Sequence, residues 1–287
     1  MLRFRINKSI FEETTKIVDD CLKHAKITAT DIDEVLLVGG SSRIPKIQEL
    51  LAEKFENDKI SKSVNPDEAV AYGAAIYGAS IYGDKKEFNF TDVLSLSFGI
   101  GTHGDIMSKI IERNTTLPCE NTVNYTTSKH DQTSVLFKVY QGESLIASRN
   151  NFLQKFSIKG IQPEPRGMAS IDVTFQFDKE GLLKITAKDR KSSIKKELDI
   201  KVESVSEVET IEMLNKVGLS EEEEKKYVKF MENKISITGT CEDLINESRD
   251  KDEQRQLKKL LKDIESLTIG DFEGIQQSRR KLANFLN

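Results

Sequence analysis

Cysteine is scarce in this sequence, and its spacing matches neither a disulfide framework nor a metal site. Three cysteines, Cys21, Cys119 and Cys241, occur in 287 residues, and no two form a Cys-x-x-Cys pair. An odd number of widely spaced thiols argues against disulfides and against a zinc site. The three histidines also lack the spacing of a metal site or a catalytic triad. We predict free thiols, no bound metal at these residues and a reducing, cytoplasmic location.

Long apolar runs and clusters of one charge are missing too. The longest aliphatic run is Val35–Val38, far short of the roughly 20 residues of a transmembrane helix. The first eight residues include Arg3, Arg5 and Lys8 and lack the apolar core of a signal peptide. The net charge is −4, and we expect the basic stretch Lys188–Lys196 to be a solvated hairpin. These features argue against a membrane or nucleic acid as the main partner. The sequence also shows no nucleophile paired with a base, which argues against catalysis other than ATP chemistry.

The first 83 residues have an α/β pattern. Apolar residues recur at helical spacing between residues 10 and 22, and Val35–Val38 is typical of a buried strand. Pro45 suits the first position of one helix. Asn65 can cap another helix, which continues through a face poor in side-chain bulk.

The turn after the predicted strand is the most informative tract. The strand runs into Gly39-Gly40, followed by Ser41, Ser42 and Arg43. A strand that ends in paired glycines and turns into a helix lets the backbone approach a phosphate. A purely structural tight turn is the alternative interpretation.

The pattern changes twice further along the chain. Residues 84–93 break the composition and are interpreted as a linker. From 94 to about 205 apolar residues alternate with a period of two, which predicts an antiparallel sandwich or barrel. From about 206 to 287 the period is helical again, and Ser220 followed by four glutamates predicts a helix start. We expect a multidomain α+β protein.

Several motifs together resemble the seventy-kilodalton heat-shock chaperone family over about residues 10–203. They are Val38–Lys46, Asn65–Ala75, Leu96–Ile100, Glu112–Pro118, Tyr140–Glu143, Gly160–Gly167, Ile171–Phe175 and Gly181–Asp189. The resemblance implies four parts. These are the C-terminal part of an actin-like nucleotide-binding domain (1–83), a linker (84–93), a β-sandwich peptide-binding domain (94–205) and a helical lid (206–287).

The resemblance also implies a nucleotide site for ATP or ADP with a metal ion. Gly39, Gly40 and Ser41 would lie against the phosphates and ribose, Arg43 along the adenine face, and Asp67 near the nucleoside. These residue types suit the task, because glycines remove bulk, a guanidinium stacks on a base and a carboxylate accepts hydrogen bonds.

The same resemblance implies a groove for an extended apolar peptide in the β domain. Its pocket would use Ile100, Val135, Phe137 and Phe177, with Thr102, His103 and Ser128 as an arch over the peptide. The alternative is that the apolar residues are ordinary sandwich core. Gly104-Asp105 stands where the family usually has two glycines.

Three functional interpretations remain open. The first is a chaperone module that binds extended apolar segments of unfolded polypeptides, with co-chaperones as further partners. The second is an ATP-dependent chaperone that is active only when a missing N-terminal part is supplied. The third is a non-functional relic whose N-terminal helices fold poorly.

We predict that this chain alone does not hydrolyse ATP. The family's first phosphate-binding loop, metal-organising acids and catalytic lysine have no counterpart in these residues. Hydrolysis needs a positioned water, a cation and charge stabilisation at the γ-phosphate. Phosphate release from purified protein, with and without Mg²⁺, checks this. Metal-dependent turnover that disappears in Arg43→Ala would contradict it.

Overall fold

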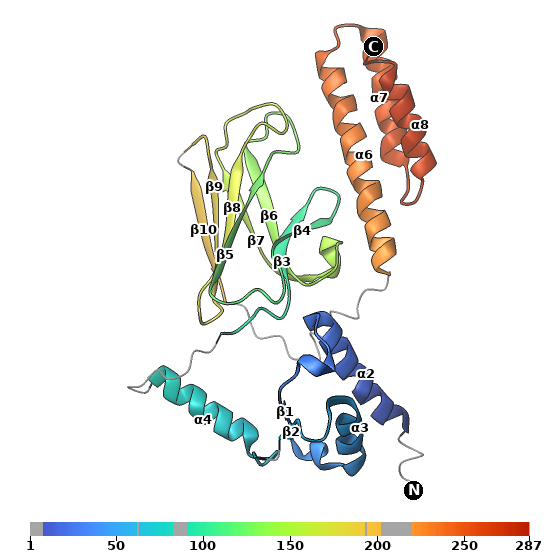
Figure 1. The fold of residues 1–287 in the computed structure, drawn as a ribbon. Coiled ribbons are helices and arrows are strands. Elements are labelled where there is room, and N and C mark those ends of the chain that lie inside the picture. Colours follow the sequence, from blue (N-terminus) through green and yellow to red (C-terminus); the bar gives the residue numbers. More distant parts are fainter. Residues whose placement is uncertain (1–7, 62, 83–90, 193, 202–219, 287) are drawn as a thin grey trace. The chain divides into compact units, whose positions relative to one another are not determined.

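The computed structural model describes residues 8–61, 63–82, 91–192, 194–201 and 220–286, which fall into two compact units (Figure 1). The units are Met1–Phe90 and Thr91–Asn287. Most of the predicted linker lies outside the described residues. Its end belongs to the second unit, because Val93 forms a β-bridge with Thr116.

The first unit contains the expected helices and a small core. Pro45 occupies the first turn of α3, as predicted. Leu51, Phe55 and Ile60 form the centre of the core, against apolar residues of α2. The elements are α2 (Lys8–Ala25), η1 (Ala29–Asp31), β1 (Val35–Leu36), η2 (Gly40–Arg43), α3 (Pro45–Phe55), β2 (Ile60–Ser61) and α4 (Ala69–Tyr82).

The prediction of a buried strand over Val35–Val38 was wrong. β1 has two residues, and Leu36 and Val38 are 50% and 47% exposed. Among the described residues β1 pairs only with β2, in parallel. A strand buried on both faces needs a sheet with layers above and below it, and a two-stranded pair does not provide one.

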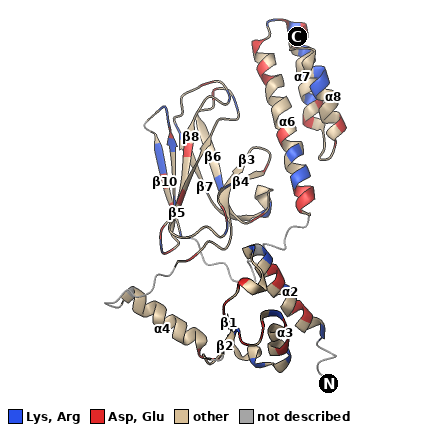
Figure 2. Ribbon diagram, viewed as in Figure 1, with Lys and Arg blue, Asp and Glu red and all other residues tan. Residues whose placement is uncertain are grey.

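Helix α4 begins later than expected and is unusually apolar. Asn65 caps a turn, since its Oδ1 accepts the Asp67 N–H at 3.3 Å, and the helix itself begins at Ala69. No residue of α4 is charged (Figure 2). Val70 is 69% exposed and Tyr82 is 89% exposed, so the helix presents apolar side chains to solvent.

The second unit contains two four-stranded antiparallel sheets, which we call the two-sheet region (residues 91–201). One sheet has the order β4-β3-β6-β7 and the other β10-β9-β8-β5. The strands are β3 (Phe98–Thr102), β4 (Ile106–Ile111), β5 (Cys119–Tyr125), β6 (Ser134–Gln141), β7 (Asn151–Lys159), β8 (Ile171–Phe177), β9 (Leu183–Asp189) and β10 (Lys195–Ile200); η3 is Ala147–Arg149.

The period-two pattern is confirmed, because alternate residues of the strands enter one core shared by both sheets. Ile171, Val173 and Phe175 are fully buried, whereas the residues between them are half-buried. A hairpin turn follows β8. There the Gly181 N–H donates to the Asp178 carbonyl at 3.2 Å, and Gly181 has φ +79°.

Three helices form the helical region (residues 220–286): α6 (Glu221–Glu247), α7 (Lys251–Ser266) and α8 (Phe272–Ala283). Ser220 caps α6 as predicted, with its Oγ accepting the Glu223 N–H at 3.3 Å. The predicted onset at 206 lies outside the described residues. Phe230, Ile237 and Cys241 of α6 pack against α7 and α8.

The three cysteines are free, as expected. Burial raises the pKa of Cys241 to about 11, so this thiol stays protonated in the helical core. In the part of the chain that the structure describes, no helix combines the length and apolar character needed to cross a membrane.

Replacing Phe175 tests the shared core. Phe175→Ala removes a fully buried ring and should lower the free energy of unfolding by about 3–5 kcal/mol, measured by denaturant titration followed by circular dichroism. The control Leu182→Ala truncates a side chain that is 41% exposed and should cost much less. Equal costs would contradict the assigned core.

Candidate functional site

The predicted nucleotide-binding residues lie together on two neighbouring loops of the first unit. Gly39 has φ +82°, and its N–H donates to the Pro66 carbonyl at 2.8 Å. A Cβ on Gly40 would lie 3.4 Å from Asp67 Oδ1. Gly40, Ser41 and Arg43 belong to the same short turn, η2.

Arg43 links the two loops through one edge of its guanidinium. Its Nη2 donates to Asn65 Oδ1 at 2.6 Å and to Asp67 Oδ2 at 2.7 Å. The side chain is 55% exposed. An arginine held by its edge keeps its planar face open for stacking on a base.

The fit of this cluster to ATP is therefore partial. Arg43 could stack on the base of the nucleoside. The Gly39-Gly40 turn would let the backbone come close to a phosphate. Across the described residues, no group of three or more His, Cys, Asp or Glu is placed to hold a metal ion. We derive no hydrolytic step from this cluster.

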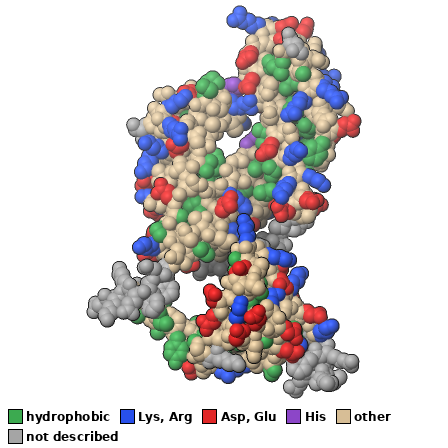
Figure 3. Space-filling view, in the orientation of Figure 1, with side chains coloured by type: hydrophobic (Ala, Val, Ile, Leu, Met, Phe, Trp, Pro, Cys, Tyr) green, Lys and Arg blue, Asp and Glu red, His purple; other side chains and the backbone are tan. Residues whose placement is uncertain are grey.

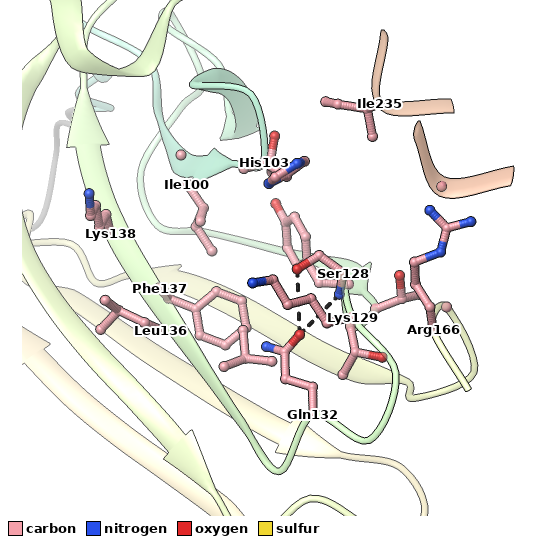
Figure 4. Close-up of a pocket in the computed structure, with 18 of the residues that line it drawn as sticks. Ile100, His103, Ser128, Lys129, Gln132, Leu136, Phe137, Lys138, Arg166 and Ile235 are labelled. Carbon is pink, nitrogen blue, oxygen red and sulfur yellow. Dashed lines mark hydrogen bonds between the residues drawn. The ribbon is translucent and has the colours of Figure 1, made fainter. Parts of the chain in front are cut away.

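The second unit contains a larger cavity, of about 1050 Å³, between the two-sheet region and α6. A hollow separates these two parts on the face drawn in Figure 3. Six of the seven predicted peptide-binding residues line this cavity, which brings together strands β3 and β6 and the loop after β5. They are Ile100, Thr102, His103, Ser128, Val135 and Phe137; of these, Figure 4 labels Ile100, His103, Ser128 and Phe137.

Phe177 was wrongly grouped with these residues. It is 1% exposed and packs edge-on against Phe98, with ring centroids 4.8 Å apart. In the β5–β8 pair, Phe177 lies opposite Cys119, whereas the cavity adjoins Tyr125, opposite Ile171. Six residues along a strand span about 20 Å, so Phe177 belongs to the far end of the core.

Tyr125 lines the cavity in its place and was missed by the sequence analysis. Its ring lies 5.9 Å from that of Phe137, and its hydroxyl shares a 2.9 Å hydrogen bond with Ser108 Oγ. Burial raises the pKa of Tyr125, so the hydroxyl stays protonated. The sequence contained a signal for this residue, because Val123 and Tyr125 alternate with polar residues along β5 and so lie on the same face of the strand. We call Ile100, Tyr125, Val135 and Phe137 the apolar floor.

Polar groups surround the apolar floor. The Ser128 N–H and hydroxyl both donate to Gln132 Oε1, at 3.2 and 3.4 Å (Figure 4). Thr127 also lines the cavity and is 4% exposed, yet its hydroxyl has no hydrogen-bond partner among the described residues. A buried hydroxyl without a partner is costly, but almost none of its surface is exposed, so a ligand would reach it only if neighbouring groups moved.

One stripe of α6 faces the two-sheet region. Its members are four residues apart, which places them on one helix face: Tyr227, Met231, Ile235, Gly239 and Asp243. The Tyr227 hydroxyl donates to the Gly104 carbonyl at 3.2 Å. Gly104 has φ +81°, which strains any other residue, and a Cβ there would lie 2.8 Å from Ile235 Cδ1 and push the end of that side chain aside.

Asp243 joins the far part of α6 to two loops of the two-sheet region. Its carboxylate accepts Arg166 Nη2 at 2.7 Å and contacts His130 Nε2 at 2.9 Å. A Cβ on Gly239 would lie 1.4 Å from Arg166 Nη1. Gly239 therefore provides the space in which the Arg166 guanidinium lies.

Glu224 joins the start of α6 to the segment after β6. It is 3% exposed, and its carboxylate accepts the Ser144 hydroxyl at 2.5 Å and the Leu145 N–H at 2.9 Å. Arg149 Nη1 lies 3.9 Å from the same carboxylate. A buried carboxylate is tolerated when it is hydrogen-bonded in this way.

Comparison with known proteins adds a family context. The family model described as Hsp70 protein matches residues 3–286. Heat shock cognate 70 kDa protein 3 of Dictyostelium discoideum is 44% identical over 185 residues, covering 63% of this chain and 29% of that protein. Chaperone protein DnaK of Mycoplasma mycoides subsp. mycoides SC is 35% identical over 286 residues, covering 97% of this chain and 48% of that protein. The chain thus spans less than half the length of either relative.

Glu224 offers a direct test of how α6 is attached. Glu224→Gln replaces one acceptor oxygen with an amide donor that faces other donors, which should cost about 2 kcal/mol. Exchange of the Leu145 amide hydrogen, followed by NMR, should then be roughly thirtyfold faster. Glu222→Gln changes an exposed residue of the same helical turn and should leave this rate unchanged. An unaltered Leu145 rate in Glu224→Gln would refute the attachment.

Proposed function

The chain belongs to the Hsp70 family, and on that premise we propose that its second unit is a chaperone module. It binds extended apolar segments of unfolded polypeptides. The two-sheet region then acts as a β-sandwich peptide-binding domain, and the helical region acts as its lid. Co-chaperone binding and a cytoplasmic location stay predictions.

The observation that carries this proposal is the cavity above the apolar floor. Its volume of about 1050 Å³ is just above the range of about 300–1,000 Å³ typical of small-ligand sites. Four apolar side chains from three strands converge there, with polar groups around them. An aliphatic side chain of a peptide would be buried on the floor, while the peptide backbone would meet the polar rim.

The expected affinity suits a chaperone that must release its client. Burying one leucine side chain contributes about 2 kcal/mol, and each backbone hydrogen bond contributes roughly 1 kcal/mol. The loss of freedom on binding offsets part of this gain. Micromolar dissociation constants are the natural result.

The contacts of α6 favour a lid that slows peptide release. Ile235, Thr238, Gly239 and Glu242 of α6 line the same cavity as the apolar floor. A peptide held there would leave only after the contacts of Glu224 or Asp243 open. Affinity would then be set mainly by the dissociation rate.

A second candidate function is nucleotide-regulated binding. The gathering of Gly39, Arg43 and Asp67 in the first unit favours it. The chain covers 48% of the length of the DnaK relative. In this second proposal, additional polypeptide supplies the rest of the nucleotide site. Peptide dissociation that changes with added nucleotide would support it.

Val135→Phe tests the apolar floor. The larger side chain would fill the space for a client leucine, and loss of that burial should weaken binding of a leucine-rich peptide roughly thirtyfold. Fluorescence anisotropy of a labelled peptide measures this, and circular dichroism checks that the fold is intact.

The matched control is Val70→Phe, at a residue of α4 that is 69% exposed. It should leave peptide affinity unchanged. A folded Val135→Phe protein that binds the peptide as tightly as the parent would show that the floor is core only.

A further inference from the structure

We infer that the outer face of α7 is a docking surface for an extended acidic polypeptide segment. This surface is separate from the site of the proposed function, because no residue of α7 lines the cavity above the apolar floor. The inference is carried by five cations on one face of the helix and by where the acids of α7 lie. We call these cations the basic stripe: Lys251, Arg255, Lys258, Lys259 and Lys262.

Helical geometry places the basic stripe on the solvent side of α7. Four of its members follow one another at intervals of four, three and four residues, which is the spacing of a single helix face. The fifth, Lys259, lies one turn from Arg255. The first and last members are eleven positions apart, or about 16 Å along the helix. The buried residues of α7 are Leu257, Leu260 and Ile264, on its other side.

Acids of the same helix do not balance the basic stripe. Gln254–Lys262 contains four cations and no acid, in a chain whose net charge is −4. All five cations are exposed, and none has a hydrogen bond or ion pair among the described residues. The acids of α7 lie in its first and last turns: Asp252, Glu253, Asp263 and Glu265.

Neighbouring cations of the basic stripe repel one another. Three pairs of its members are four residues apart, among them Lys258 and Lys262, and like charges at this spacing destabilise a helix. By contrast, Lys225 of α6 has Glu221 at the same spacing and pairs with it at 2.6 Å. A row of carboxylates from a partner would replace repulsion along the stripe with attraction.

The helix packed beside α7 is also basic. α7 and α8 share the helical core, and Figure 2 shows Lys and Arg on both helices. After Glu273, α8 contains Arg279, Arg280 and Lys281 and no acid. The neighbouring helix therefore adds positive charge to this part of the molecule and does not neutralise the basic stripe.

The composition of α7 favours a polypeptide over other anions. Single-stranded nucleic acids stack their bases on aromatic side chains, and α7 has no aromatic residue. A helix that lies on a membrane inserts its apolar face, and that face of α7 is buried in the helical core.

The spacing of the cations fits an extended chain. Alternate side chains of an extended strand point to the same side, about 7 Å apart. Residues four apart in a helix are separated by about 6 Å along its axis. Successive carboxylates of an extended acidic segment can therefore meet successive cations of the basic stripe.

A labelled peptide of eight glutamates tests the inference, with a peptide of eight glutamines as the uncharged reference. Binding to the full chain is measured by fluorescence anisotropy at low salt and at about 0.3 M salt, where exposed charges are screened. We expect the glutamate peptide to bind at low salt and to lose most of its affinity at high salt. The glutamine peptide should not bind, and Val135→Phe should leave the glutamate affinity unchanged.

Paired variants assign the binding to residues. Lys258→Gln with Lys262→Gln should weaken binding of the glutamate peptide about three- to tenfold at low salt. The matched control is Lys179→Gln with Lys196→Gln, at two exposed lysines of the two-sheet region. It changes the net charge equally and should leave the affinity unchanged. Circular dichroism checks that both proteins are folded.

Four outcomes would overturn the inference. They are no binding of the glutamate peptide at low salt, equal weakening in both double variants, and loss of binding in Val135→Phe, which would place the peptide in the cavity. The fourth is tighter binding of an eight-nucleotide RNA or of phosphatidylserine vesicles that Lys258→Gln with Lys262→Gln abolishes, which would change the class of partner. The proposed function stands or falls separately, with the leucine-rich peptide.

Discussion

Two carboxylates hold α6 against the two-sheet region, and the cavity depends on this attachment. Glu224 anchors the start of the helix through Ser144 and Leu145, and Asp243 anchors its far part through Arg166 and His130. They are nineteen positions apart in the sequence, or about 28 Å along the helix. The part of α6 between these two residues forms one wall of the cavity. The cavity is therefore enclosed by a helix that polar contacts hold in place near both of its ends.

This arrangement suits binding that must be reversible. The apolar floor is built into the shared core of the two sheets and is as rigid as that core. The wall opposite it is held by hydrogen bonds and ion pairs, which water can replace. Under the proposed function, a client would meet a preformed floor and a wall that can open, and the wall would control its release.

The first unit has a smaller core than the second and exposes more of its apolar side chains. β1 pairs only with β2 in the described part, and α4 exposes several large apolar residues. The sequence patterns of this unit correctly predicted a helix at Pro45 and a cap at Asn65. The predicted burial of Val35–Val38 was wrong, because a strand is buried only where other layers pack on both of its faces. A run of four apolar residues does not show whether such layers exist.

The sequence by itself determined the family, the element types and most of the floor. Helical and strand periods, the Ser220 cap and the turn at Gly181 are local features, so they can be read within a few residues. Only the tertiary structure decided that Tyr125, and not Phe177, joins Ile100, Val135 and Phe137. It also decided that the Arg166 guanidinium lies beside Gly239. These depend on strand register and on contacts between residues far apart in the sequence, such as His130 and Asp243, which are 113 positions apart. No local period encodes such contacts.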